Sequence, residues 1–228
     1  MFFWGDITYL LLIPALILSV YAQGKVNSTF NRYLKVQSKK GYTGAQVARR
    51  ILDENGLYEV PIQLINGNLS DHYDPGKRVL RLSNAVYNSS SVASLGVAAH
   101  EVGHAIQHAT GYTPLRVRNS IAPIASFGSQ TAWFLFFIGL IFSAPSLMDL
   151  GIIFFLAAVI FQVVTLPVEF NASSKAIALL KSNGLITSGE VEPVRKVLGA
   201  AALTYVAATA TAVLQLLRLL ILRGNRDD

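Results

Sequence analysis

Four long runs of uncharged residues alternate with polar segments along this chain. The runs cover residues 7–24, 119–148, 150–168 and 197–217. A helix needs about 20 apolar residues to cross the hydrocarbon core of a bilayer. The pattern therefore predicts a mainly α-helical, multi-pass membrane protein with a helical bundle built from these runs.

The runs divide the chain into five parts. They are a first transmembrane helix in residues 1–22, a polar domain in 23–120, a transmembrane helical hairpin in 121–168, a further helix in 169–196, and a fourth hydrophobic helix with a basic tail in 197–228. Proline disfavours helix at the residue before it, so Ala144-Pro145 predicts the turn of the hairpin. The fourth hydrophobic helix contains several threonines and Gln215, so it either packs inside the bundle or lies against the membrane surface.

Composition supports a membrane protein. Hydrophobic residues make up 52% of the chain and charged residues only 14%, whereas a soluble domain has about 25% charged residues. This balance excludes disordered, collagen-like and coiled-coil chains. Because there is no cysteine, the chain has neither a disulfide framework nor a cysteine nucleophile.

The placement of lysine and arginine predicts the orientation. Residues 23–120 hold 12 of the 19 basic residues and residues 167–196 hold four, while the turn at 143–148 has none. Because cytoplasmic loops carry the excess of Lys and Arg, we expect an outside N-terminus, a plasma-membrane location, and both polar segments in the cytoplasm. The basic residues that set this orientation account for the net charge of +6, so no nucleic-acid partner is expected. The basic tail after residue 217 disagrees with this orientation if the fourth helix crosses fully.

The polar domain begins with helix and strand signals. Thr43 and Gln46 have the spacing of a capping box, so residues 41–56 are predicted to form a helix that ends at a glycine. Residues 60–65 and 78–82 are short and either β-branched or alternating. We expect these two segments to pair as a β-hairpin or a small edge pair.

Residues 92–110 are predicted to form a helix that carries the candidate chemistry. This segment contains HEVGHAIQH, an H-E-x-x-H signature formed by His100, Glu101 and His104. Two histidines four residues apart lie on one face of a helix, so both imidazoles can reach one Zn²⁺. The glutamate between them is placed to take a proton from a water on the metal. The string therefore predicts a catalytic zinc site with one Zn²⁺ per chain.

A catalytic zinc site needs a third protein ligand. His108 lies two helical turns from His100, which is too far to share one tetrahedron comfortably, so we expect it to support the site or lie at the surface. Glu169 is the better candidate, because a carboxylate at the end of an apolar run is costly unless it is paired or bound to a metal. The remaining alternatives are Glu54, Glu59, Glu190 and Glu192.

Several segments resemble a known family. The resemblance rests on the leading hydrophobic helix, on DHYDPGKRVLRLS before the site, on AAHEVGHAIQH, and on LPVEFNASSKA after the third run. In these features the chain is similar, over nearly its whole length, to the YugP-like family of neutral zinc metallopeptidases, which are bacterial multi-pass membrane proteins. More distantly it is similar to the HtpX and CAAX-prenyl-protease group of gluzincins, in which a glutamate that opens an E-x-x-A-D helix is the third zinc ligand. Glu169 and Ala172 match that pattern, and Ser173 stands where the distant group has aspartate.

The resemblance implies metal-dependent hydrolysis of a protein or peptide substrate, with a metalloendopeptidase favoured. It implies that His100, His104 and Glu169 hold the zinc and that Glu101 activates the water. In gluzincins generally, an edge strand beside the metal pairs with the substrate backbone, and residues 78–82 are the candidate here.

Further residues are expected to support the metal ligands or to bind substrate, namely His108, His72, Tyr73 and Ser173. His72, Tyr73 and Tyr205 are also candidates to stabilise the oxyanion. Two alternatives stay open. One is a membrane-bound scaffold or adaptor that keeps zinc without activity. The other is an intramembrane protease with H-E-x-x-H inside a span, which the polar residues before the string disfavour.

Overall fold

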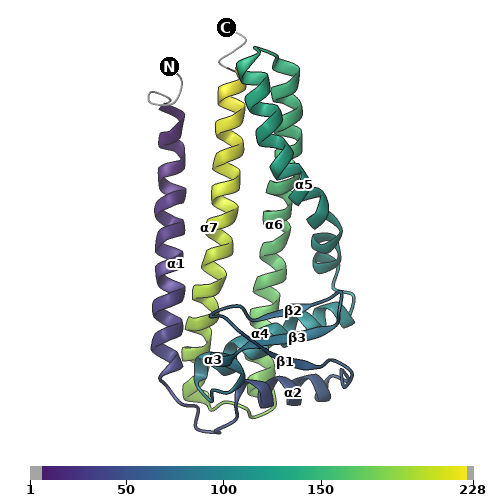
Figure 1. The fold of residues 1–228 in the computed structure, drawn as a ribbon. Helices are drawn as coiled ribbons and strands as arrows, with labels where there is room; N and C mark the ends of the chain where they lie inside the picture. The colour runs from purple at the N-terminus through teal and green to yellow at the C-terminus, as the bar shows by residue number, and fades with distance from the viewer. Residues whose placement is uncertain (1–6, 225–228) are drawn as a thin grey trace. The chain divides into compact units, whose positions relative to one another are not determined.

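The computed structural model describes residues 7–224, and most of them are helical (Figure 1). Within these residues, four helical stretches are long and apolar enough to cross a membrane. They are the 3-10 helix η1 (Ile7–Leu12) continued by α1 (Ile13–Leu34), α5 (Thr113–Ile141), α6 (Pro145–Ser182), and η2 (Ser188–Glu190) continued by α7 (Val191–Gly224). The expected mainly helical, multi-pass architecture is confirmed.

These helices extend beyond the uncharged runs. α1 continues past Lys25, and α7 begins before the first residue of the fourth run. α6 runs without a break through Pro167, so the third run and residues 169–182 are one helix. The expected single helix over 169–196 ends at Ser182, and α7 begins at Val191. A charge marks where a chain can leave the hydrocarbon, but it does not end the helical hydrogen bonding, and helices in membranes tolerate an internal proline. The predicted turn at Ala144-Pro145 is confirmed, because α5 ends at Ile141 and α6 begins at Pro145.

The described residues form two compact units. The first comprises residues 7–23, 116–167 and 204–224, and the second comprises residues 24–115 and 168–203. In the first unit, side chains from α5, α6 and α7 form an apolar cluster of Ala132, Phe136, Met148, Phe155, Val159 and Leu219. A Cβ on Gly151 would lie 2.8 Å from the carbonyl oxygen of Ala132, so glycine lets the backbones of α5 and α6 approach closely.

The first unit also holds basic residues that are paired. Arg218 is buried, its Nε donates a hydrogen bond to Thr8 Oγ1 at 3.1 Å, and its guanidinium lies 3.8 Å from the centre of the Tyr9 ring. Arg223 Nε lies 2.8 Å from Asp149 Oδ1. An arginine inside or beside a membrane span is costly unless it is paired, and these contacts supply the partners.

The second unit contains α2 (Gly44–Glu54), α3 (Asn84–Tyr87) and α4 (Val92–Ala109). The capping box of α2 is confirmed, because Gln46 N donates to Thr43 Oγ1 at 3.3 Å and Thr43 N donates to Gln46 Oε1 at 2.9 Å. α4 begins with a similar cap, in which Ser94 N donates to Ser91 Oγ at 3.1 Å. These bonds satisfy backbone N–H groups that a helix cannot pair internally.

The sheet of the second unit differs from the expected hairpin. β1 (Ile62–Ile65) pairs parallel with β3 (Val79–Ser83), and β2 (His72–Asp74) pairs antiparallel with the other side of β3. The expected pairing of residues 60–65 with 78–82 is confirmed, since β1 pairs with β3. The expected hairpin between them is wrong, because the two strands are parallel and the intervening chain adds β2, which makes the hairpin with β3. β3 is central in the order β1-β3-β2, so the expectation that residues 78–82 form an open edge is also wrong. The two edge strands of the sheet are β1 and β2, one on either side of β3.

The core of the second unit lies between α2, α4 and the sheet. Leu80 and Leu82 of β3 are fully buried, as are Ile51 of α2 and Val102 of α4. The apolar face of α4 therefore packs inward, which leaves the histidines of the H-E-x-x-H string on another face of the same helix.

Candidate metal centre

The two histidines of the H-E-x-x-H string face each other across one turn of α4. Their Nε2 atoms are 3.2 Å apart, and the two rings meet edge to face with centroids 4.7 Å apart. This arrangement follows from the helix itself, because residues four apart lie on one face. Both side chains are largely buried, with about a tenth of each side chain exposed.

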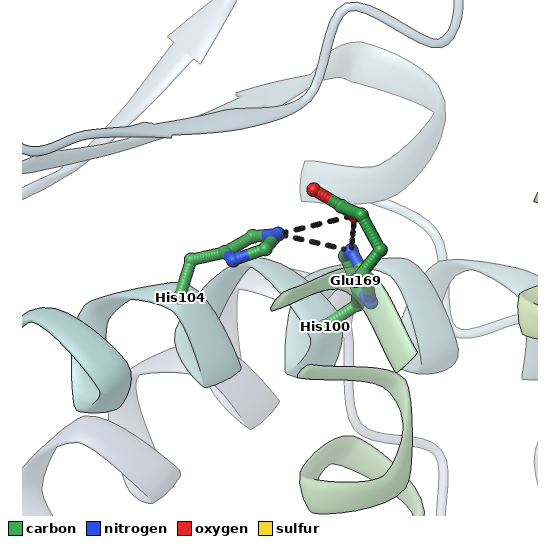
Figure 2. A group of neighbouring side chains, drawn as sticks. All are labelled: His100, His104 and Glu169. Atoms are coloured by element: carbon green, nitrogen blue, oxygen red, sulfur yellow. Dashed lines mark hydrogen bonds and ion pairs between the residues drawn. The ribbon is translucent and has the colours of Figure 1, made fainter. Parts of the chain in front are cut away.

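α6 brings Glu169 to these histidines. Its Oε2 lies 3.3 Å from His100 Nε2 and 3.5 Å from His104 Nε2, and the residue is 3% exposed (Figure 2). His100, His104 and Glu169 form the group of potential metal ligands found within residues 7–224. Sequence reasoning proposed this set, and the structure brings its three members together.

The spacing of these three atoms fits a zinc ion. Zinc bonds to nitrogen and oxygen ligands of about 2.0–2.1 Å make a tetrahedron whose edge is about 3.3 Å. The observed edges are 3.2, 3.3 and 3.5 Å. Two imidazoles and one carboxylate are also a ligand set that catalytic zinc uses. The residues present therefore fit the metal in both chemistry and size.

The glycine of the H-E-V-G-H string allows α6 to come this close. A Cβ on Gly103 would lie 3.0 Å from the carbonyl oxygen of Ala172 and 3.3 Å from its Cα. Ala172 is less than one turn after Glu169 on α6. The missing side chain at Gly103 thus lets the backbone of α6 pass against α4 where the carboxylate must reach the histidines.

Each histidine has a partner at its other ring nitrogen. Ser173 Oγ lies 3.1 Å from His100 Nδ1, and Gln107 Oε1 lies 3.0 Å from His104 Nδ1. A ligating histidine usually donates its second N–H in this way, which fixes the tautomer and turns the ring toward the metal. Ser173 was expected to support the site, and it takes this position although the distant gluzincins have aspartate there. Gln107 was missed by sequence reasoning.

Glu101 lies beside the group but is not one of its members. It is buried, and its Oε2 accepts a hydrogen bond from Tyr73 N of β2 at 3.1 Å. Burial raises the pKa of Glu101, the two neighbouring histidines lower it, and Glu169 and Asp71 raise it. The Tyr73 N–H thus binds Oε2 of the carboxylate rather than Oε1.

The remaining candidates divide into two groups. The Tyr73 hydroxyl and His108 Nδ1 are 2.9 Å apart, and both residues line a cavity of about 220 Å³ together with Leu57, Glu59, Val60, Arg78, Ala105 and Ala109. His72 is exposed instead, with its ring nitrogens near Ser70 O and the Arg81 guanidinium. Thus His108, one helical turn after His104 on α4, contacts Tyr73 of β2. His72 is not part of the metal centre.

Asp71 supports the strand that carries Tyr73. Its Oδ1 accepts from Ser83 N at 2.7 Å and its Oδ2 accepts from Ser83 Oγ at 3.1 Å. Burial raises the pKa of Asp71, and the two hydrogen bonds from Ser83 oppose that shift. The alternative ligands Glu54, Glu190 and Glu192 are engaged elsewhere, with Arg50, with Thr187 and Lys39, and with Arg195.

Fold and site together define a membrane protein with a candidate metal centre of two histidines and one glutamate. Comparison with known proteins gives the same class. A family model described as "putative neutral zinc metallopeptidase" matches residues 8–224. The Bacillus subtilis (strain 168) protein named "putative membrane protease YugP" is 51% identical over 219 residues, which cover 96% of this chain and 97% of that protein. The chain belongs to this zinc metallopeptidase family. Among solved structures, none matches the chain.

Proposed function

We propose that this protein is a membrane-embedded zinc metalloendopeptidase that binds one Zn²⁺ through His100, His104 and Glu169. The single observation that carries the proposal is the triangle of ligand atoms with edges of 3.2, 3.3 and 3.5 Å beside a buried Glu101. When bound, zinc supplies a Lewis acid that acidifies water and polarises the scissile carbonyl.

Glu101 acts as the general base in this proposal. Its Oε2 is held by the Tyr73 N–H, so the carboxylate cannot turn freely and Oε1 is presented to the attacking water. Oε1 takes the proton of that water, and Glu101 then delivers the proton to the leaving amine. The buried surroundings of Glu101 favour holding this proton between the two steps.

The substrate is held by the open edge of β2 and by the cavity next to it. The N–H of Tyr73 is bound to Glu101, so an extended peptide that lies along β2 passes beside the general base. His108 and Tyr73 line the cavity, which has room for one substrate side chain. β2 thereby takes the role that sequence reasoning gave to residues 78–82.

The proposal places the centre in the cytoplasm, in a protein of the plasma membrane. The observation behind it is the excess of Lys and Arg in residues 23–120 and 167–196, which contain all the proposed ligands. Its partners are then a cytoplasmic peptide or protein substrate and the lipid bilayer.

Glu101→Gln tests the proposal. The amide cannot accept the proton, so turnover should fall by about 10²–10⁴-fold while zinc stays bound. Purified protein in detergent is incubated with a proteome-derived peptide mixture, cleavage is read by mass spectrometry, and zinc is counted by elemental analysis. Glu54→Gln, at an exposed glutamate paired with Arg50, is the matched control.

Two results would overturn the proposal. Cleavage by the Glu101→Gln variant at the wild-type rate would show that Glu101 is not the general base. A wild-type protein that binds zinc but cleaves no peptide, and whose cellular phenotype survives Glu101→Gln, would instead establish the scaffold alternative.

A further inference from the structure

Gln107 connects the two helices that carry the proposed ligands. It lies on α4, three residues after His104, and is fully buried. Its Oε1 is 3.0 Å from His104 Nδ1, while its Nε2 donates to Val168 O and to Asn171 Oδ1 of α6, each at 2.9 Å. Both polar atoms of this amide are therefore in use, and the Nε2 group uses both of its N–H bonds.

The partner on α6 decides which way the amide faces. A backbone carbonyl can only accept hydrogen bonds, so Val168 O requires the NH₂ end of Gln107 to point toward α6. The oxygen end then points toward His104, where it can only accept, and so Nδ1 must carry the hydrogen. A neutral imidazole with its hydrogen on Nδ1 keeps its lone pair on Nε2, which is the atom that faces His100 and Glu169.

The same amide also holds the chain on both sides of Glu169. Val168 precedes Glu169 directly and Asn171 follows it by two residues. Two hydrogen bonds at these flanking positions fix the height and rotation of this turn of α6 against α4. The packing of Gly103 against Ala172 brings the helices together, and the amide sets their register.

We propose that Gln107 is a positioning residue that sets the tautomer of His104 and the placement of Glu169 through one side chain. The inference rests on the proposed zinc site, and it adds that the two kinds of ligand are coupled. Loss of the α6 bonds then weakens the metal site even when His104 keeps its partner.

Gln107→Glu separates the two halves of this role. A carboxylate still accepts from His104 Nδ1, but it cannot donate to Val168 O or Asn171 Oδ1. We expect zinc affinity to fall by about 10–100-fold, as changes around metal ligands usually cause. Gln107→Met, which removes all three bonds, should lower it at least as far. Affinity is measured by competition with a chelator on the purified full chain, and the absorption spectrum of the Co²⁺-loaded protein reports ligand geometry.

Gln215→Met is the matched control. Gln215 is a buried glutamine on α7 in the first unit, and its Nε2 has no hydrogen-bond partner among residues 7–224. The same chemical change there should leave zinc affinity and the Co²⁺ spectrum as in the wild type. A general loss of packing would affect both variants.

Asn171 gives a test that does not depend on the folding of the Gln107 variants. Asn171→Ala removes one acceptor and should weaken zinc binding by a smaller factor, whereas Asn171→Asp keeps an acceptor and should restore it. Wild-type zinc affinity and Co²⁺ spectrum in Gln107→Glu, or equal affinities for the two Asn171 variants, would overturn the coupling. A wild-type protein that binds no zinc would overturn the proposed function instead.

Discussion

Gly103→Ala is a sharp test of how the site is assembled, because it adds one methyl group where α4 meets α6. The new Cβ would lie 3.0 Å from Ala172 O, and ordinary contact begins at 3.4 Å, so α6 must retreat by about 0.4 Å. Glu169 lies on the same turn and would move with it, lengthening its separations from the histidine nitrogens from 3.3 and 3.5 Å to about 3.7 and 3.9 Å. A zinc ion held at bond lengths within about 0.2 Å of their usual values could not reach all three ligand atoms as well after such a shift. We therefore expect zinc affinity to fall by about 10–100-fold.

The stability of this variant should change less than its metal binding. Overpacking costs about 1–3 kcal/mol, and replacing a helical glycine by alanine returns about 1 kcal/mol. Chelator competition gives the affinity, and thermal unfolding of the metal-free protein in detergent gives the stability. Gly199→Ala on α7, where an added Cβ meets nothing within 4 Å, should bind zinc like the wild type. Unchanged zinc affinity in Gly103→Ala would refute the idea that close backbone approach sets the ligand triangle.

Three other predictions concern ligands, topology and pH. Glu169→Ala should lose zinc. His108→Ala should keep measurable metal, because the His108 side chain contacts the Tyr73 hydroxyl at 2.9 Å rather than the proposed ligands. Elemental analysis measures the zinc, and the reverse result would require a site of three histidines. Single cysteines introduced at Ser90 and Ser182 should react alike with an impermeant thiol reagent, because one metal needs residues 23–120 and 167–196 on the same side of the membrane. Opposite labelling would exclude Glu169 as a ligand. Burial raises the pKa of Asp71, so the folded state binds this proton more strongly than the unfolded state, and stability falls as pH rises through the folded pKa. Asp71→Asn should therefore reduce the fall in melting temperature as pH rises above the ordinary Asp pKa of about 4. An unchanged pH dependence of the melting temperature would contradict this.

Local signals made the helices predictable. The capping box of Thr43 and Gln46 fixes the start of α2 through bonds between residues three apart, and the i,i+4 spacing of His100 and His104 fixes their common face. The two-residue signal Ala144-Pro145 marked the turn before α6 in the same way. Each of these features depends on a few neighbouring residues, so the sequence contains the information directly.

Features that depend on distant residues were not predictable in this way. The parallel pairing of Ile62 with Leu80 and the place of β2 at the edge depend on how the whole second unit packs, and strand patterns do not specify strand order. Gln107 looks like an ordinary polar residue of a helix until α6 is placed against it. A signal did exist, because a glutamine three residues after a histidine proposed to bind metal lies on nearly the same helix face. Glu169 could be proposed because a carboxylate ending an apolar run is conspicuous.

The division of the ligands between α4 and α6 has a consequence during synthesis of the protein. Glu169 follows His104 by 65 residues, so a ribosome working at about 5–20 residues per second reaches it roughly 3–13 s after the second histidine. In that interval the nascent chain has the proposed general base, Glu101, and two of the proposed ligands but not the third. If the proposed zinc site needs all three ligands, the unfinished chain cannot yet cut itself or the translocation machinery beside it. The proposed activity would therefore begin only after the part of α6 that carries Glu169 has been made and has packed against α4.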